Sequence, residues 1–242
     1  IKYLRKFYVE DKCQKQYRGE RICWESLEDY QEIIKSDALE RETRVFELML
    51  SMEKPVIFEQ DRIPFIRTVV NYPYFIFDDC LKGKNIHENG MLSNICVDYS
   101  LLLSCGFEKK LEQIDEKMAE FKSNDRAIAE LTAMKRHLKA VLDLCERYKV
   151  CAYQSGNLTV AKMLEEIPLK APKSFYQALC ALRIIHFAMW SSGAYHNTLG
   201  RIDKLLYPYY KNDIEKAVLS KDEAFELLLE FFLCFNKDSD LY

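Results

Sequence analysis

An apolar helix near the C-terminal end places the strongest constraint on how this chain of 242 residues can fold. Ser220 and Glu223 have the spacing of a capping box, in which each side chain accepts a hydrogen bond from the other residue's backbone N–H. The stretch that follows, AFELLLEFFLCF, is apolar almost all round a helix, and such helices are buried on most sides. We therefore expect this helix to need more protein around it than the chain supplies.

Both ends of the sequence look cut. The chain opens on Ile1 rather than methionine, and it closes on Leu241-Tyr242 directly after the apolar helix, without a polar tail. We expect the isolated chain to expose more apolar surface than the roughly few hundred Å² of ordinary monomers, and therefore to self-associate.

Several other segments have the periodicity of helices. Asp37 can cap a helix that ends before Pro55, and apolar residues at three- to four-residue steps predict one long or two consecutive helices between 109 and 150. A further helix follows Pro172, with His186 on its apolar stripe as a hydrogen-bonded core residue. Residues 55–106 are instead short apolar-aromatic pieces broken by proline and glycine, which predicts loops and short elements.

Composition excludes several classes of partner and site. A net charge of -3 with mixed signs gives no basic surface for nucleic acid, and the longest uncharged run, residues 184–200, is too interrupted to span a membrane. The nine cysteines lack zinc-site spacing, and the N-terminus lacks a secretory apolar run, so we expect free thiols in a reducing cytoplasm. His87-Glu88 lacks the second histidine of a zinc helix, so no metal site is predicted. Asp78-Asp79 could be a carboxylate pair for acid–base chemistry, but adjacent side chains point apart, which favours a turn or cap.

The segment Gly200-Arg201-Ile202-Asp203 is the most unusual in the chain. If it is extended, Arg201 and Asp203 lie on the same face, while Gly200 allows a close approach of backbone. The apolar neighbourhood favours a buried, fork-paired ion pair between them. On spacing alone, a structural salt bridge at the start of a strand is the favoured interpretation.

Two longer runs resemble a known family. PLKAPKSFYQALCALRIIHFAMW and TLGRIDKLLYPYYKNDIEKAVLSKDEAFELLLEFF are similar, in order and spacing, to the glycyl radical enzymes of the pyruvate formate-lyase type. KPVIFEQDRIPFIRT and CVDYSLLLSCGF resemble the same family more weakly. The resemblance implies a ten-stranded α/β barrel wrapped in helices. In this mostly α chain it implies a helical part at 1–54, loops and short elements near the pocket at 55–108, and helices plus the first barrel strand at 109–242.

The same resemblance implies a radical mechanism whose central residues lie elsewhere. In that family a glycyl radical oxidises a cysteine, whose thiyl radical abstracts a hydrogen atom from the substrate. Neither the Gly-Cys loop nor the Arg-Val-x-Gly-Tyr loop occurs in this sequence, so the chain holds no catalytic residue, binds no cofactor and is expected to be inactive alone. The family implies a radical-SAM activating enzyme, which would install the glycyl radical in the missing C-terminal part, and a homodimer.

The resemblance also implies residues near the substrate. Thr198 and Asp203 match positions that reach substrate hydroxyl or amine groups in dehydratase-like members, with Gly200 and Arg201 as structural neighbours. Strict alternation would place Thr198 and Asp203 on opposite faces, so a shared pocket requires a break that Gly200 could supply.

A second stretch of the resemblance contributes Asn94 and, as a structural neighbour, Tyr99. Asn94 stands where dehydratase members carry a histidine. An amide cannot act as a general base, which disfavours glycerol-like or diol dehydration.

Two functions follow as hypotheses. The first is the N-terminal fragment of a glycyl radical lyase that acts on a small polar molecule by elimination or by C–C cleavage. The alternative is a non-catalytic helical scaffold or interaction module that keeps the outer part of the same architecture.

Overall fold

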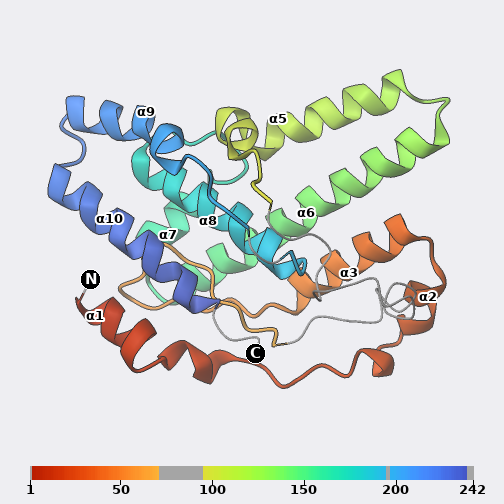
Figure 1. Cartoon of the computed structure of the whole chain (residues 1–242), viewed down its shortest axis with the longest axis horizontal. Helices are drawn as coiled ribbons and strands as arrows, with labels where there is room; N and C mark the ends of the chain where they lie inside the picture. The colour runs from red at the N-terminus through yellow and green to blue at the C-terminus, as the bar shows by residue number, and fades with distance from the viewer. Residues whose placement is uncertain (1, 71–94, 195–196, 239–242) are drawn as a thin grey trace.

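The computed structural model describes residues 2–70, 95–194 and 197–238, and within these ranges the chain consists mostly of helices (Figure 1). The α-helices are α1 Lys2–Arg5, α2 Tyr30–Lys35, α3 Ala38–Met52, α5 Tyr99–Glu120, α6 Asp125–Gln154, α7 Leu158–Leu164, α8 Phe175–Ser191, α9 Ile202–Glu215 and α10 Lys221–Cys234. Short π or 3-10 turns are η1 Lys6–Glu10, η2 Cys13–Tyr17, η3 Trp24–Ser26 and η5 Phe235–Lys237. In these ranges, no helix has the length and apolar character that crossing a membrane requires.

The longer helices begin where the sequence provides capping side chains. Asp37 accepts a hydrogen bond from the first turn of α3 at 2.9 Å, and Ser174 caps α8 in the same way. At the start of α10, Ser220 and Glu223 form both hydrogen bonds of the capping box. The predicted starts of α3 and α10 are therefore confirmed.

Helix α8 lies at the centre of the main core. Most of its residues are buried, and α3, α5, α9 and α10 pack against it. The 30-residue helix α6 packs against α3, α5 and α7. Figure 1 shows α5 and α6 as a long antiparallel hairpin at one side, with α9 and α10 at the other. Of the two alternatives predicted for residues 109–150, one long helix or two consecutive helices, the structure has the second; α5 begins at Tyr99 but is kinked at Gly106, whose backbone angles are not helical.

The predicted barrel strand after Gly200 is wrong, because this segment forms helix α9, which continues through Pro208. The apolar positions recur at i, i+3, i+4, i+7 and i+8, so a helix can turn all of them toward the main core whereas a strand would divide them between two faces. These core-facing residues are Ile202, Leu205, Leu206, Tyr209 and Tyr210. Within the described ranges, strand-type pairing is limited to an isolated parallel bridge between Cys96 and Thr198.

A segment without helix or strand, residues 61–69, runs through the middle of the helices, and all but one of its residues are buried. Backbone N–H groups removed from water need a partner, and here the partners are side chains of the surrounding helices. Glu53 accepts from the N–H groups of Thr68 and Val69 at 2.7 and 3.3 Å. Glu230 accepts from those of Arg62 and Ile63 at 2.6 and 3.1 Å. The Tyr148 hydroxyl accepts from the Ile66 N–H at 3.0 Å.

The carbonyl groups of this segment are satisfied in the same manner. The Asn157 side chain donates to the Asp61 carbonyl at 2.7 Å, and the Tyr176 hydroxyl donates to that of Arg62 at 2.6 Å. Lys237 donates to the Ile63 carbonyl at 2.8 Å, and Arg183 donates to that of Phe65 at 2.7 Å. The cations are also neutralised, since Lys237 pairs with Asp61 and Arg183 forms a two-pronged pair with Asp238. The segment therefore binds two buried cations, Arg183 from α8 and Lys237 from η5.

Replacing Glu230 by alanine should strongly destabilise the chain. The variant leaves the N–H groups of Arg62 and Ile63 and the Arg62 guanidinium without their acceptor, which should lower the free energy of unfolding by about 3–5 kcal/mol. The control Glu226→Ala removes an exposed carboxylate of the same helix and should change stability by less than about 0.5 kcal/mol. Urea unfolding followed by circular dichroism measures both, and equal losses would contradict this account.

The predicted core position of His186 is confirmed. The imidazole is 7% exposed and contacts the Phe235 ring edge-on at 4.7 Å between centroids. Its Nδ1 atom has no hydrogen-bond partner among the described residues. Burial, followed by the charge of Arg183, lowers the pKa of His186 to about 4 from an ordinary value of 6.5.

The chain should lose stability as the pH falls from 6.5 toward 4. In this window the unfolded chain binds a proton at residue 186 that the folded chain does not, so the free energy of unfolding decreases, by about 3 kcal/mol in total. His186→Gln should flatten this dependence, leaving the smaller slope from His137, whose pKa is also lowered by burial. Urea titrations at several pH values measure the slope, and an unchanged slope in the variant would disprove the assignment.

Candidate functional site

Two segments that lie about a hundred residues apart in the sequence meet at one edge of the helices. The Thr198 N–H donates to the Ile95 carbonyl at 2.9 Å, and Cys96 and Thr198 form the isolated parallel bridge. The Tyr99 hydroxyl donates to the Thr198 carbonyl at 3.5 Å. We name residues 95–99 and 197–203 the loop pair. It joins Tyr99 with Thr198, two of the residues that the family resemblance places near a substrate.

Tyr99 holds the loop pair from the inside. Its ring is 1% exposed at the start of α5, and burial, followed by the neighbouring Cys96, raises the pKa of its hydroxyl to about 12. Tyr99 therefore stays protonated at neutral pH and acts as a hydrogen-bond donor. Its carbonyl partner belongs to Thr198, whose side chain is exposed to solvent.

Gly200 is required by the geometry of this edge. Its φ of 60° lies in the left-handed region, and a Cβ atom there would stand 2.7 Å from the Cys96 Sγ. The predicted close approach at Gly200 thus exists, although a side chain and not backbone makes it. Because the chain turns here and α9 begins at Ile202, the segment does not continue the alternation of a strand beyond Gly200.

Arg201 and Asp203 form the predicted two-pronged pair, but it is not buried. Arg201 Nε and Nη2 donate to the two carboxylate oxygens at 2.8 and 2.5 Å, while the side chains are 68% and 62% exposed. The expectation of a buried pair was wrong because it inferred burial from apolar neighbours in an extended segment, whereas Asp203 lies in the first turn of a surface helix. The hydrogen bond from Arg201 lowers the pKa of Asp203 to about 2, so this carboxylate is ionised at neutral pH.

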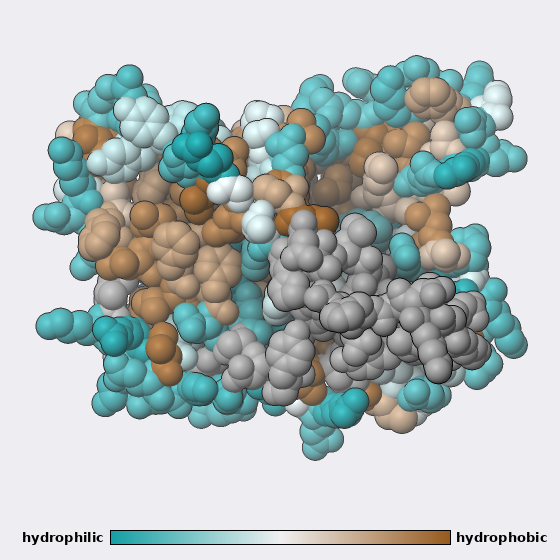
Figure 2. Space-filling model, in the orientation of Figure 1, coloured by the Kyte–Doolittle hydropathy of each residue, from teal (hydrophilic) through white to brown (hydrophobic). Residues whose placement is uncertain are grey.

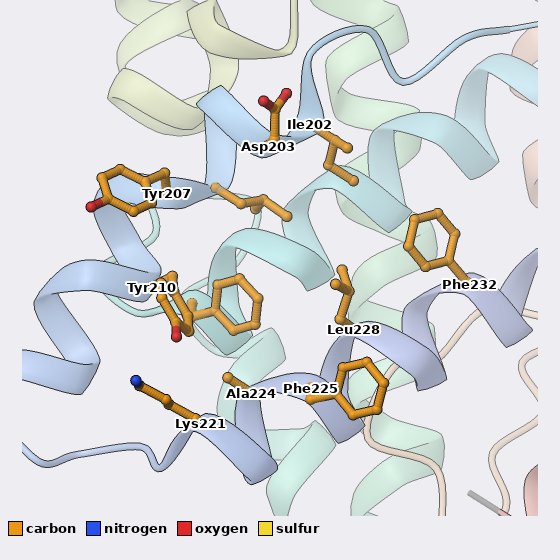
Figure 3. Close-up of a pocket in the computed structure, with 11 residues that line it drawn as sticks. Ile202, Asp203, Tyr207, Tyr210, Lys221, Ala224, Phe225, Leu228 and Phe232 are labelled. Atoms are coloured by element: carbon orange, nitrogen blue, oxygen red, sulfur yellow. The ribbon is translucent and has the colours of Figure 1, made fainter.

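The other predicted site residue, Asn94, lies outside the described residues. Asp203 is three residues beyond Gly200 in the loop pair, on the rim of an apolar groove between α9 and α10. In Figure 3 its carboxylate points away from the apolar side chains of this groove. The described residues contain no cluster of histidine, cysteine and carboxylate side chains that could hold a metal ion.

The groove has a volume of about 430 Å³ and contains few polar side chains. The α10 wall was foreseeable from the apolar character of residues 224–235, but the α9 wall was missed because that segment was predicted to be a strand. Of the tyrosines around Pro208, Tyr209 donates to the Leu103 carbonyl at 3.2 Å, whereas Tyr207 is 58% exposed at the groove.

Comparison with known proteins identifies the class of enzyme to which this architecture belongs. The family described as pyruvate formate lyase-like matches residues 79–241, so the chain is a member of that family. The chain is 39% identical over 70 residues to a 4-hydroxyphenylacetate decarboxylase glycyl radical subunit from Clostridioides difficile, a match that covers 28% of this chain and 8% of the relative. It is 27% identical over 108 residues to a trans-4-hydroxy-L-proline dehydratase from the same organism, covering 42% and 13%.

Solved structures show the same fold across nearly the whole chain. A structure of 1,2-propanediol dehydration in Roseburia inulinivorans matches with a TM-score of 0.80 at 18% identity, covering 99% of this chain and 38% of that one. A glycyl radical enzyme from Archaeoglobus fulgidus matches with a TM-score of 0.75 at 17% identity, covering 96% and 40%. The chain thus spans well under half the length of these relatives.

Gly200→Ala should cost more stability than Gly156→Ala. Both glycines have a positive φ, but a Cβ at Gly156 would have no neighbour within 4 Å. Left-handed strain alone should cost Gly156→Ala about 1 kcal/mol, and the contact with the Cys96 Sγ should add less than about 1 kcal/mol at Gly200, because an exposed side chain can rotate to relieve part of the overlap.

Cys96→Ala tests the source of the additional cost. Cys96 is exposed, so its replacement alone should be nearly neutral, yet in the Gly200→Ala background it should recover most of the additional loss. Denaturant unfolding of the wild type, the two single variants and the double variant gives the coupling free energy between positions 96 and 200. Additive effects would argue against the close contact.

Proposed function

We propose that this chain is the N-terminal portion of a glycyl radical lyase that acts on a small polar molecule. The observation that carries the proposal is the loop pair, which assembles Thr198, Gly200 and Tyr99 from segments about a hundred residues apart. Membership of the pyruvate formate lyase-like family and the fold match over 99% of the chain support the same conclusion.

Thr198 and Asp203 are proposed to bind the substrate, with Asn94 as a third contact. An exposed threonine hydroxyl can both donate and accept a hydrogen bond. Asp203 is an ionised acceptor, and each carboxylate oxygen that Arg201 binds keeps a further lone pair for a substrate hydroxyl or ammonium group. With a pKa near 2, Asp203 positions the substrate and does not donate a proton to it.

Hydrogen-atom abstraction would be supplied by a glycyl radical and a cysteine that lie outside this sequence. The relatives' names include a decarboxylase, dehydratases and a sulfite-lyase, so the proposal extends to elimination or C–C cleavage and leaves the bond open. A radical-SAM activating enzyme as partner, a homodimeric assembly and a cytoplasmic, anaerobic setting complete the proposal. The chain itself is proposed to bind no cofactor.

The test uses the complete gene product, activated by a radical-SAM enzyme and supplied with 4-hydroxyphenylacetate, trans-4-hydroxy-L-proline or 1,2-propanediol. We expect a glycyl radical signal in electron paramagnetic resonance and turnover of at least one compound. A complete gene product without cysteine and glycine loops, or without a radical signal after activation, would favour the alternative, a non-catalytic helical scaffold.

Asp203→Asn should reduce turnover in this enzyme while leaving its radical content and folding unchanged. Loss of a charge-assisted hydrogen bond to the substrate costs about 1.5–3 kcal/mol, which corresponds to a decrease in kcat/KM of about 10- to 150-fold. Asp222→Asn changes an exposed aspartate in the first turn of α10 and is the matched control, with turnover unchanged. Full activity of Asp203→Asn would show that Asp203 does not contact the substrate.

A further inference from the structure

Helix α10 has two apolar stripes, and only one of them is fully buried. The inward stripe, at Ala224, Leu227, Phe231 and Cys234, is buried against the main core. A second stripe, formed by Phe225, Leu228 and Phe232, has i, i+3 and i+7 spacing, which is the pattern of a helix face that packs against another element. Phe225 and Phe232 are nevertheless 61% and 46% exposed.

Helix α9 supplies the facing wall of the groove. Ile202, Leu206, Tyr207 and Tyr210 line it from this side, and Phe175 of α8 lies at its base. Figure 2 shows the apolar side chains gathered between α9 and α10, with hydrophilic residues around them. The surface is therefore a continuous apolar groove and not a scatter of single exposed residues.

The chemistry of the walls determines what kind of segment fits. Phe225, Leu228 and Phe232 on one side and Tyr207 on the other offer rings and methyl groups, and few hydrogen-bonding groups. A strand or loop in the groove would bury backbone N–H and C=O groups without partners. A helix satisfies its own backbone, and its ridges of side chains fit between those of two neighbouring helices.

We propose that the groove between α9 and α10 is the docking surface for an apolar helix from the remaining part of the same glycyl radical enzyme. This inference rests on the proposed function. Its support is the difference in length, since the chain matches the two solved relatives over 96% and 99% of itself but over only 40% and 38% of their chains. More than half of each relative has no counterpart here, and this groove is a large apolar surface for it to cover.

The test compares side-chain oxidation by hydroxyl radicals in the 242-residue chain and in the complete gene product, with mass-spectrometric detection. In the isolated chain Tyr207, Phe225 and Phe232 should be oxidised readily, because all three are exposed. In the complete protein their oxidation rates should fall about tenfold, because a packed interface excludes water.

The double variant Phe225→Ser with Phe232→Ser identifies the packed surface. In the complete protein it should restore Tyr207 oxidation to the rate of the isolated chain, while the helical circular dichroism of the isolated chain should stay unchanged. Leu158→Ser, at a residue of α7 that is 53% exposed and outside the groove, is the control and should leave Tyr207 oxidation unchanged in both proteins.

Three outcomes would overturn the proposal. The first is equal oxidation of the groove residues in the two wild-type proteins. The second is protection of the isolated chain that grows with concentration and disappears in the double variant, because the occupant is then a second copy. The third is a gene that ends with this chain and has no companion polypeptide. The radical signal is measured separately, so a protected groove in a protein without a glycyl radical would refute the proposed function and leave the docking surface intact.

Discussion

The fold depends on burying residues 61–69, a stretch of backbone that has no helix or sheet of its own. An unpaired peptide group in the interior costs about as much as a lost hydrogen bond, so these residues can be buried only if side chains replace the missing backbone partners. Glu53, Glu230 and Tyr148 accept from its N–H groups, and Lys237 and Arg183 donate to its carbonyls. The end of α3, the helices α6, α8 and α10, and the turn η5 are thereby fixed to one segment.

The need to satisfy the backbone of residues 61–69 also explains why so many charged side chains lie inside the fold. Arg183 is fully buried, bonded to Asp238 and over the Phe187 ring, and Lys237 is buried between Asp61 and Ile63. Buried ion pairs seldom add much stability compared with apolar packing, but each accepts few alternative geometries. They fix the position of α8 and of the end of α10 relative to the segment, and α8 in turn leads to the loop pair.

The loop pair is built on this framework from two directions. Helix α5 carries Tyr99 at its start, and the chain beyond α8 carries Thr198, so the hydrogen bond between them depends on how α5 packs against α8. The exposed groove follows from the same packing, because α10 turns one of its two apolar stripes toward the core and leaves the other at the surface. Membership of the pyruvate formate lyase-like family gives both features a context, since the solved relatives extend well beyond the part that this chain matches.

The sequence by itself determined what depends on a few neighbouring residues. The caps at Asp37 and Ser220 and the helices that follow could be predicted, because caps and apolar periodicity act within one or two turns. The apolar character of α10 on nearly all of its faces was also visible in its residues. The helix after Gly200 could also have been predicted from the helical spacing of its apolar residues. Tertiary structure alone decided that Arg201 and Asp203 face solvent and that Thr198 pairs with Cys96. Those outcomes depend on contacts across about a hundred residues, and local spacing carries no information about which distant surface a side chain will meet.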